Sequence, residues 1–125
     1  MSRSRLALTL TPALAAALVL AVPAGGRPAA PAATYAVTVT AKEYSFKLSR
    51  TAYRSGDLVT FRLRNAGTLP HDFKISKPVS KKTPVILRGK TASFKLRLTK
   101  KGVYSYLCTV GDHARRGMRG TFRVR

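Results

Sequence analysis

The amino-acid sequence predicts an all-β protein, a two-sheet antiparallel sandwich with Greek-key connections and about seven or eight strands. Two observations predict this fold class. Short runs in which apolar and polar residues alternate recur along the chain, whereas no segment of ten or more residues has a helical period. Turn-forming residues separate these runs. Each such strand has one apolar face, and two sheets packed face to face bury those faces together.

The alternating runs can be followed in chain order. Apolar side chains take every second position, and basic side chains mostly take the positions between them. The runs cover residues 35–40, 45–49, 59–64, 94–98 and 122–124. The turn signals between runs are Ser55-Gly56-Asp57, Asn65-Ala66-Gly67, Lys77-Pro78, Arg88-Gly89-Lys90 and Lys100-Lys101-Gly102. This pattern places most basic side chains on the outer faces of the two predicted sheets.

A further strand is expected over residues 102–108, and it ends at the single cysteine of the chain, Cys108. Tyr104 and Tyr106 lie on the same face of this strand as Cys108, because side chains alternate between the two faces. If this face points between the sheets, the sulfur emerges at the end of the core and is shielded from water. Such shielding slows oxidation of the thiol.

The first 24 residues have the organisation of a secretory signal peptide. Arg3 and Arg5 precede an apolar run over residues 6–22, and small residues at 22–24 offer a site for signal peptidase. We therefore expect an exported protein, located in the periplasm, outside the cell or at the cell surface. The alternative that the sequence leaves open is retention of this segment as a membrane anchor.

A short linker and one folded domain follow. Residues 25–33 consist of Gly, Pro and Ala with one Arg, a composition that does not bury a core. Residues 34–125 are enough for one small domain and too few for two. We expect this domain to be a monomer.

The folded domain carries a large positive charge. Three of the 24 basic residues precede Thr34, so the remaining 21 stand against all four acidic residues and give a formal charge of +17. A field of this sign favours an acidic protein as partner, or an anionic membrane or cell-wall surface. Nucleic acid is not expected as a partner, because the predicted export removes the protein from it.

Very few side chains of this protein are of a type that can bind a soft metal ion. The chain contains one cysteine (Cys108), two histidines (His71 and His113) and one methionine besides the initiator (Met118). One thiolate, two imidazoles and a thioether are the ligand set of a blue-copper electron-transfer centre, a trigonal site with a weak axial methionine. Each residue alone also has an ordinary explanation, as a turn or core residue. Together they predict one bound Cu(I)/Cu(II) ion.

The spacing of these ligands suits a single metal-binding loop. Four residues separate Cys108 from His113, and four more separate His113 from Met118. Gly111 and Gly117 provide the backbone freedom that so tight a loop requires. Since the first histidine comes from a different strand connection, the metal should link two parts of the sandwich and stabilise the fold. A single cysteine has no partner for a disulfide within the chain, and an exposed free thiol would be oxidised in the compartment to which the protein is exported. A role as metal ligand explains why the cysteine is present.

Residues 56–73, together with residues 104–108 and the loop that carries the last three ligands, resemble the cupredoxins, the plastocyanin and azurin family of blue copper proteins. The resemblance extends over about residues 35–125. It implies a cupredoxin-like sandwich with one copper ion, bound by His71, Cys108, His113 and Met118. The gap between the cysteine and the second histidine is more similar to that of azurin than to that of plastocyanin.

One residue beside the ligands departs from the family pattern. The residue after the first histidine is commonly Asn in the family, where its amide connects the two ligand loops, and here it is Asp72. We expect Asp72, with Pro70 and Thr109, to support the ligands without binding the metal. A carboxylate accepts the same backbone hydrogen bonds as the amide but adds negative charge, which should lower the reduction potential.

A second departure concerns the surface around the second histidine. The family often has an apolar patch there, whereas this chain has Arg115, Arg116 and Arg119. We expect these arginines to dock the redox partner. Docking should therefore be electrostatic and sensitive to salt.

The sequence predicts a one-electron carrier and not an enzyme. A second or trinuclear copper centre needs more than two histidines, a dinuclear electron-entry site needs a second cysteine, and the four acidic residues offer no paired carboxylates. Two alternatives stay open: a copper carrier or chaperone of the same fold, and a basic module that binds polyanions. A chaperone would transfer Cu(I) to an apo-partner, and a polyanion-binding module would bind without copper.

Overall fold

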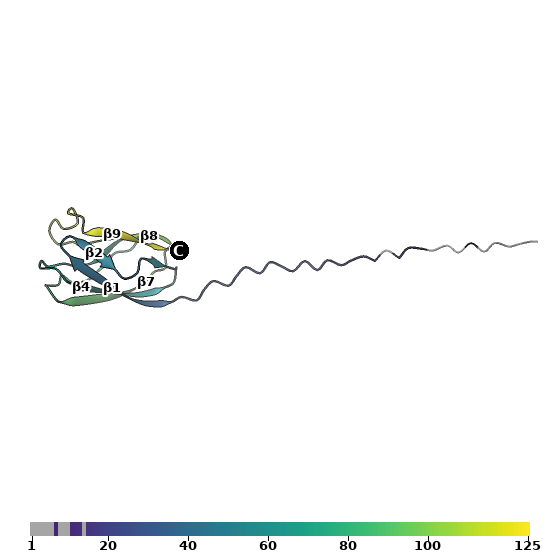
Figure 1. Cartoon of the computed structure of the whole chain (residues 1–125), viewed down its shortest axis with the longest axis horizontal. Helices are drawn as coiled ribbons and strands as arrows, with labels where there is room; N and C mark the ends of the chain where they lie inside the picture. The colour runs from purple at the N-terminus through teal and green to yellow at the C-terminus, as the bar shows by residue number, and fades with distance from the viewer. Residues whose placement is uncertain (1–6, 8–10, 14) are drawn as a thin grey trace, which may run out of the picture.

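The computed structural model describes residues 7, 11–13 and 15–125, and these contain nine strands and no helix. The strands are β1 (Thr34–Lys42), β2 (Ser45–Leu48), β3 (Ala52–Tyr53), β4 (Leu58–Asn65), β5 (Lys74–Lys77), β6 (Lys81–Lys82), β7 (Thr91–Arg97), β8 (Gly102–Leu107) and β9 (Arg119–Val124). They form two sheets packed as two layers (Figure 1). The predicted all-β sandwich is therefore confirmed.

Two strand pairs are parallel, whereas the sequence predicted antiparallel pairing. The first sheet has the order β2-β1-β4-β7 and the second the order β3-β9-β8-β5-β6. β1 runs parallel to β4 and β3 runs parallel to β9, and the other neighbours are antiparallel. The chain leaves the first sheet after β2, forms β3 in the second sheet, and returns as β4 beside β1. A hairpin forces two consecutive strands to be antiparallel, whereas a strand that returns by a crossover can pair in parallel.

The number of strands also differs slightly from the prediction. β3 and β6 contain two residues each, which is too short for an alternating pattern to be recognised in the sequence. Both lie at the edges of the second sheet. They extend that sheet without changing the architecture.

Aromatic side chains fill the space between the two sheets. Phe61 on β4 is fully buried, and its ring centroid lies 5.6 Å from that of Phe94 in its own sheet and 5.6 Å from that of Phe122 in the other. It also packs near Tyr53 and near Phe73, with centroids 6.3 Å and 5.7 Å away. Since Phe73 lies two residues after the first histidine, this aromatic core reaches from the centre of the sandwich to the predicted metal site.

The two ends of the sandwich carry different parts of the chain (Figure 1). The N-terminal segment enters and the C-terminus lies at one end, and the loop that follows β8 lies at the other. The described residues before β1 have no regular secondary structure, and no helix long and apolar enough to cross a membrane occurs in the described chain. The predicted signal peptide, residues 1–24, lies partly outside the described residues and stays a prediction.

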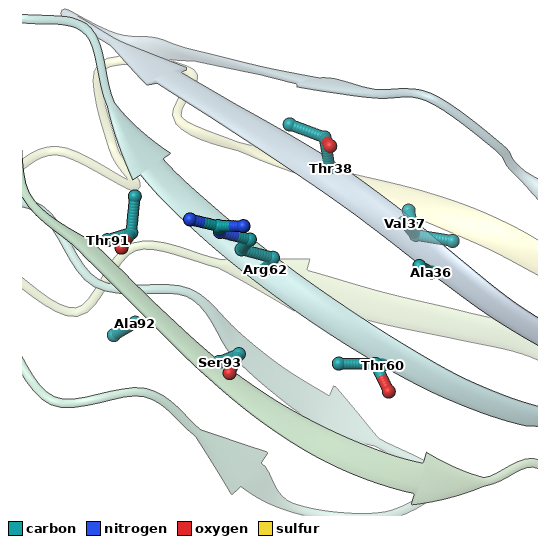
Figure 2. A pocket seen from close by; sticks show the side chains of 8 residues that line it. All are labelled: Ala36, Val37, Thr38, Thr60, Arg62, Thr91, Ala92 and Ser93. Carbon is teal, nitrogen blue, oxygen red and sulfur yellow. The ribbon is translucent and has the colours of Figure 1, made fainter.

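The outer face of the first sheet has a shallow hollow over β1, β4 and β7 (Figure 2). Small and hydroxyl-bearing side chains line it together with the guanidinium of Arg62. None of the predicted ligands lines this hollow. The features that carry metal chemistry are therefore at the end of the sandwich and not on its sheet face.

Candidate metal centre

His71 is placed by a short bridge and by a buried amide side chain. Its backbone N–H donates to the carbonyl of Ile86 (3.1 Å), and the N–H of Ile86 donates back to the carbonyl of His71 (2.8 Å). Asn65, buried at the end of β4, donates from Nδ2 to the carbonyls of Leu69 (2.8 Å) and Ile86 (3.0 Å), and its Oδ1 accepts from the N–H of Gly67 (2.9 Å). Asn65 therefore shapes the loop that carries His71.

Cys108 directly follows β8, and its face of the strand is buried as the sequence predicted. Tyr104 is fully buried, Tyr106 and Cys108 are nearly so, and Val103 on the opposite face is half exposed. The period of two along the strand thus places the sulfur at the end of the aromatic core. Water has little access to it there.

The loop after Cys108 folds back on itself through backbone hydrogen bonds. Gly111 and Gly117 have φ angles of 47° and 105°, in the region that favours glycine, as the tight spacing predicted. The N–H of Met118 donates to the carbonyl of His113 (3.0 Å), and the N–H of Cys108 donates to the carbonyl of Met118 (3.0 Å). These bonds bring the buried Met118 beside two of the other ligands.

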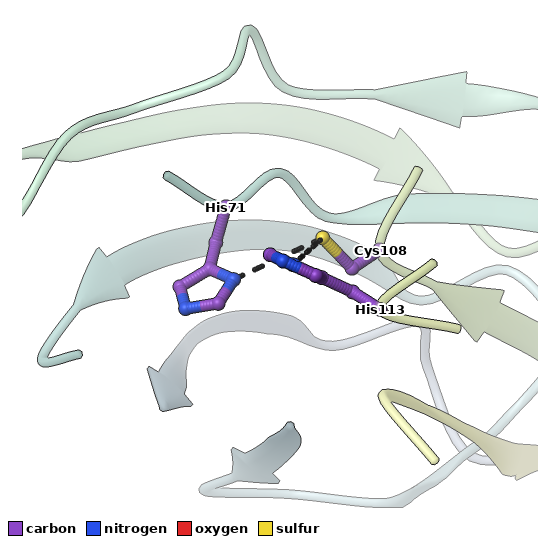
Figure 3. A group of neighbouring side chains, drawn as sticks. All are labelled: His71, Cys108 and His113. Carbon is purple, nitrogen blue, oxygen red and sulfur yellow. Dashed lines mark hydrogen bonds between the residues drawn. The ribbon is translucent and has the colours of Figure 1, made fainter. Parts of the chain in front are cut away.

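Three of the four predicted ligands converge (Figure 3). The Nδ1 atom of His71 lies 3.9 Å from the Sγ atom of Cys108, and the Nδ1 atom of His113 lies 3.6 Å from the same sulfur. One donor atom from each residue lies within 4.8 Å of the others, and all three residues are buried. In the part of the chain that the structure describes, no second group of this kind occurs.

The donor spacing fits one copper ion. Nitrogen and sulfur donors bind a first-row divalent ion at about 2.0–2.3 Å, so that two of them in a trigonal plane lie about 3.8 Å apart. The observed separations of 3.9 Å and 3.6 Å are close to this value. A thiolate with two imidazoles and a thioether is a donor set for copper. His71, Cys108, His113 and Met118 form a type 1 copper site for one ion.

The surroundings of Cys108 favour a metal-bound thiolate. Burial raises the pKa of its thiol, and the backbone amides of Asp72 and Val110 offset part of this rise, while the charge of the Asp72 carboxylate adds to it. A thiolate without a counterion is therefore unfavourable at this position. A cation that binds the sulfur removes this cost, which couples metal binding to the ionisation of the thiol.

Asp72 connects the two ligand loops, as its position beside His71 suggested. Its Oδ1 accepts a hydrogen bond from the backbone N–H of Thr109 (2.6 Å), and its Oδ2 accepts one from the Thr109 hydroxyl. Asp72 is fully buried, and Thr109 directly follows Cys108. Pro70 is half-buried on the other side of His71, where its ring fixes the backbone φ angle. The carboxylate of Asp72 thus belongs to the residue that follows His71 and is hydrogen-bonded to the residue that follows Cys108.

Replacing Asp72 by asparagine is expected to raise the reduction potential. The amide oxygen still accepts the Thr109 N–H, but the negative charge that favours the cupric state is lost. A redox titration measures the change. As a control, Thr109→Val removes the hydroxyl donor that offsets the charge, and it should shift the potential in the opposite direction and by less. An unchanged or lower potential in Asp72→Asn would contradict the role of the charge.

Two residues that the sequence did not single out contact the histidines. Glu43 and Tyr44 form the turn between β1 and β2. The Oε1 atom of Glu43 lies 3.1 Å from Nε2 of His71, and the ring centroid of Tyr44 lies 5.2 Å from that of His113. The backbone amide of Leu69 is the largest of several hydrogen bonds that lower the pKa of Glu43 to about 2. The sequence contained one indication of a special role for Glu43, which is one of only four acidic residues in a chain with 24 basic ones.

The three arginines predicted to dock a partner lie in two places. Arg115 and Arg116 belong to the ligand loop, and Arg119 is the first residue of β9. Arg116 is paired with Asp112 (Nε to Oδ2, 2.8 Å), and its guanidinium lies 5.0 Å from the ring centroid of Tyr44. The side chain of Arg116 is therefore held against the turn that contacts His113.

Comparison with known proteins identifies relatives of this fold. A family model described as a cupredoxin-like domain matches residues 12–122. Auracyanin B is 19% identical with a TM-score of 0.62, over 77% of this chain and 91% of the other. Auracyanin A, a "blue" copper protein of Chloroflexus aurantiacus, is 17% identical with a TM-score of 0.61, over 74% and 99%.

A mutant of amicyanin in its reduced form has a higher sequence identity to this chain than the two auracyanins have. It is 28% identical with a TM-score of 0.51, over 72% of this chain and 82% of the other. No curated protein matches the chain. The family match covers most of the sequence, and the buried group of two imidazoles and a thiolate occupies the end of the sandwich. The chain therefore belongs to the cupredoxin-like family, as its ligand pattern predicted.

Proposed function

We propose that this protein is an exported, monomeric one-electron carrier that passes electrons between an acidic redox protein and a second partner. The observation that carries the proposal is the buried group of His71, Cys108 and His113, whose donor atoms lie within 4.8 Å of one another. Copper supplies the one-electron couple between its cupric and cuprous states. Thiolate and imidazole ligands bind both states, and a weak thioether perturbs neither much.

The protein's contribution is to keep these ligands in place while the charge changes. His71 is fixed by backbone hydrogen bonds to Ile86, and the ligand loop is closed by the bonds among Cys108, His113 and Met118. A set of donors held this way rearranges little between the two oxidation states. Rapid electron exchange with little reorganisation is therefore the chemistry that the site supports.

His113 is the ligand through which electrons most easily reach the surface. It is 6% exposed, whereas His71 and Cys108 are 0% and 1% exposed. The loop around it carries Arg115 and Arg116, so an acidic protein would approach the site along a favourable electrostatic path. The proposed export is supported by the N-terminal sequence, and by the lone cysteine that the metal would protect.

The proposal is tested by redox cycling of the copper-loaded protein. We expect an intense visible band that disappears on reduction with ascorbate and returns with hexacyanoferrate(III), with copper retained through repeated cycles. If reduction instead releases Cu(I) to a chelator of moderate affinity, the protein is a copper carrier or chaperone. If a heparin column retains the copper-free Cys108→Ser variant unchanged and no redox cycle is seen, the protein is a polyanion-binding module.

The charge of the ligand loop is expected to control the rate of electron exchange. Arg115→Glu should slow oxidation by the anionic hexacyanoferrate(III) roughly three- to tenfold at low salt, because it reverses a charge beside His113. Stopped-flow measurements at increasing ionic strength should show the difference shrinking. Lys101→Glu makes the same charge change next to the start of β8, at the other end of the strand from Cys108. An equal effect of both variants would show that net charge acts, and not this face.

A further inference from the structure

Three nitrogen atoms surround one carboxylate oxygen of Glu43. Its Oε1 accepts from the backbone N–H groups of Thr68 and Leu69, each at 2.7 Å, and lies 3.1 Å from Nε2 of His71. Glu43 belongs to the β1–β2 turn, so these bonds connect that turn to the loop between β4 and β5. The contact with His71 therefore forms part of a hydrogen-bonded connection between two loops.

The loop leaves space for this carboxylate only because of a glycine. A Cβ atom at Gly67 would lie 2.3 Å from Oε1 and 2.8 Å from the carboxyl carbon of Glu43. The Oδ1 atom of Asn65 accepts a hydrogen bond from the N–H of Gly67 and keeps the glycine in this position. The absence of a side chain at Gly67 is thus what allows Glu43 to reach His71.

The ionic surroundings of Glu43 are unusual for so basic a protein. The chain has 24 basic and four acidic residues. Of the described residues, Asp112 pairs with Arg116, whereas the partner of Glu43 within ion-pair distance is His71. Asp72 and Asp57 accept hydrogen bonds from backbone amides. The carboxylate of Glu43 is therefore directed at an imidazole and not at one of the many cationic side chains.

The two ring nitrogens of His71 face different groups. Nδ1 lies on the side of Cys108 Sγ, and Nε2 faces Glu43. A neutral imidazole carries one proton, and a hydrogen bond to an acceptor determines which nitrogen holds it. A carboxylate at Nε2 holds the proton there and leaves the lone pair on Nδ1, on the side where the copper ligands converge.

We propose that Glu43 is a positioning residue of the copper site, which fixes the Nε2–H tautomer and the ring orientation of His71 through a hydrogen bond that Gly67 makes sterically possible. The inference rests on the proposed copper function. The carboxylate also increases electron donation by the imidazole, which favours the cupric state. Because His71 is fully buried, its Nε2–H would lack an acceptor without Glu43.

Three variants test the proposal. Glu43→Gln keeps the side-chain shape and an oxygen that accepts the Thr68 and Leu69 amides, but it removes the charge. Gly67→Ala keeps the carboxylate and displaces it from His71 by steric contact. Asp112→Asn is the control, since it removes one negative charge from the ligand loop without contacting a histidine side chain in the hydrogen-bond network.

The first readout is the tautomer of His71, measured by nitrogen NMR of the copper-free full chain at a pH where imidazole is neutral. We expect the Nε2–H form in the wild-type protein and in Asp112→Asn, and a mixture of forms in Gly67→Ala. A single Nε2–H form in Gly67→Ala would overturn the proposal. This readout needs no copper, so it separates a failure of the positioning role from a failure of the electron-carrier function.

The second readout is the copper complex itself. Chelator competition should show copper affinity lower by about 10- to 100-fold in Gly67→Ala, and lower by a smaller factor in Glu43→Gln. The reduction potential should rise in both variants. Asp112→Asn should change the affinity less than about threefold, because an exposed ion pair contributes little. Equal changes in Glu43→Gln and Asp112→Asn, together with no change in Gly67→Ala, would mean that only net charge matters and would overturn the positioning role.

Discussion

Replacing Cys108 by alanine is expected to abolish the visible absorption of the copper-loaded protein. The intense band of a type 1 site arises from charge transfer between the thiolate and the cupric ion, and Cys108 is the only cysteine of the chain. Loss of the band should be complete, because no other thiolate can replace it. The measurement is the absorption spectrum after addition of one equivalent of Cu(II).

Met118→Leu is the matched control for this experiment. It removes the weak axial ligand from the same loop and leaves the trigonal ligands in place, so the band should persist with a changed position or intensity. Thermal unfolding gives a second comparison. Copper at 100 times its dissociation constant stabilises a protein by about 2.7 kcal/mol, and this gain should be largely lost in Cys108→Ala. A band that survives in Cys108→Ala would refute the proposed site.

The second large effect is expected from Phe61→Ala. Phe61 is fully buried and packs near aromatic rings of both sheets, including Phe94 and Phe122. Truncation leaves a cavity that these neighbours cannot fill, and such changes cost about 3–5 kcal/mol. In a domain of this size the melting temperature should fall by roughly 15–30 °C. Calorimetry of the copper-free protein measures this change without a contribution from the metal.

Val103→Ala is the control for the core substitution. Val103 lies on β8 and is about half exposed, at 49%, so its truncation should change the free energy of unfolding by less than about 0.5 kcal/mol. A small effect of Phe61→Ala, comparable to that of Val103→Ala, would contradict the packing described for the aromatic core. A large effect with normal copper affinity would show that the core and the site can be perturbed separately.

The copper ligands could be predicted from the sequence because the choice was so limited. A chain with one cysteine, two histidines and one internal methionine can form only one such site. The burial of Cys108 followed from the alternation of side chains along its strand, with Tyr104 and Tyr106 on the same face. The sequence also predicted that a carboxylate after the first histidine accepts a backbone hydrogen bond, and Asp72 accepts one from the N–H of Thr109 and another from its hydroxyl.

The residues that position the ligands could not be predicted in this way. Glu43 is 28 residues away from His71 in sequence, and the contact exists only because the β1–β2 turn reaches the loop between β4 and β5. Tyr44 contacts His113 from the same turn. Such contacts depend on how the chain passes from one sheet to the other. The alternation of apolar and polar side chains along a single strand carries no information about these connections.

The sequence by itself determined the strand-forming character of the domain, the identity of the copper ligands and the basic surface of the protein. These properties depend on composition and on periodicity within single segments, which local chemistry sets. Only the tertiary structure decided that β1 runs parallel to β4, that Nδ1 of His71 lies near the sulfur of Cys108, and that Glu43 contacts the other ring nitrogen. These features depend on which distant segments become neighbours, and that is settled by packing the two sheets around one shared core.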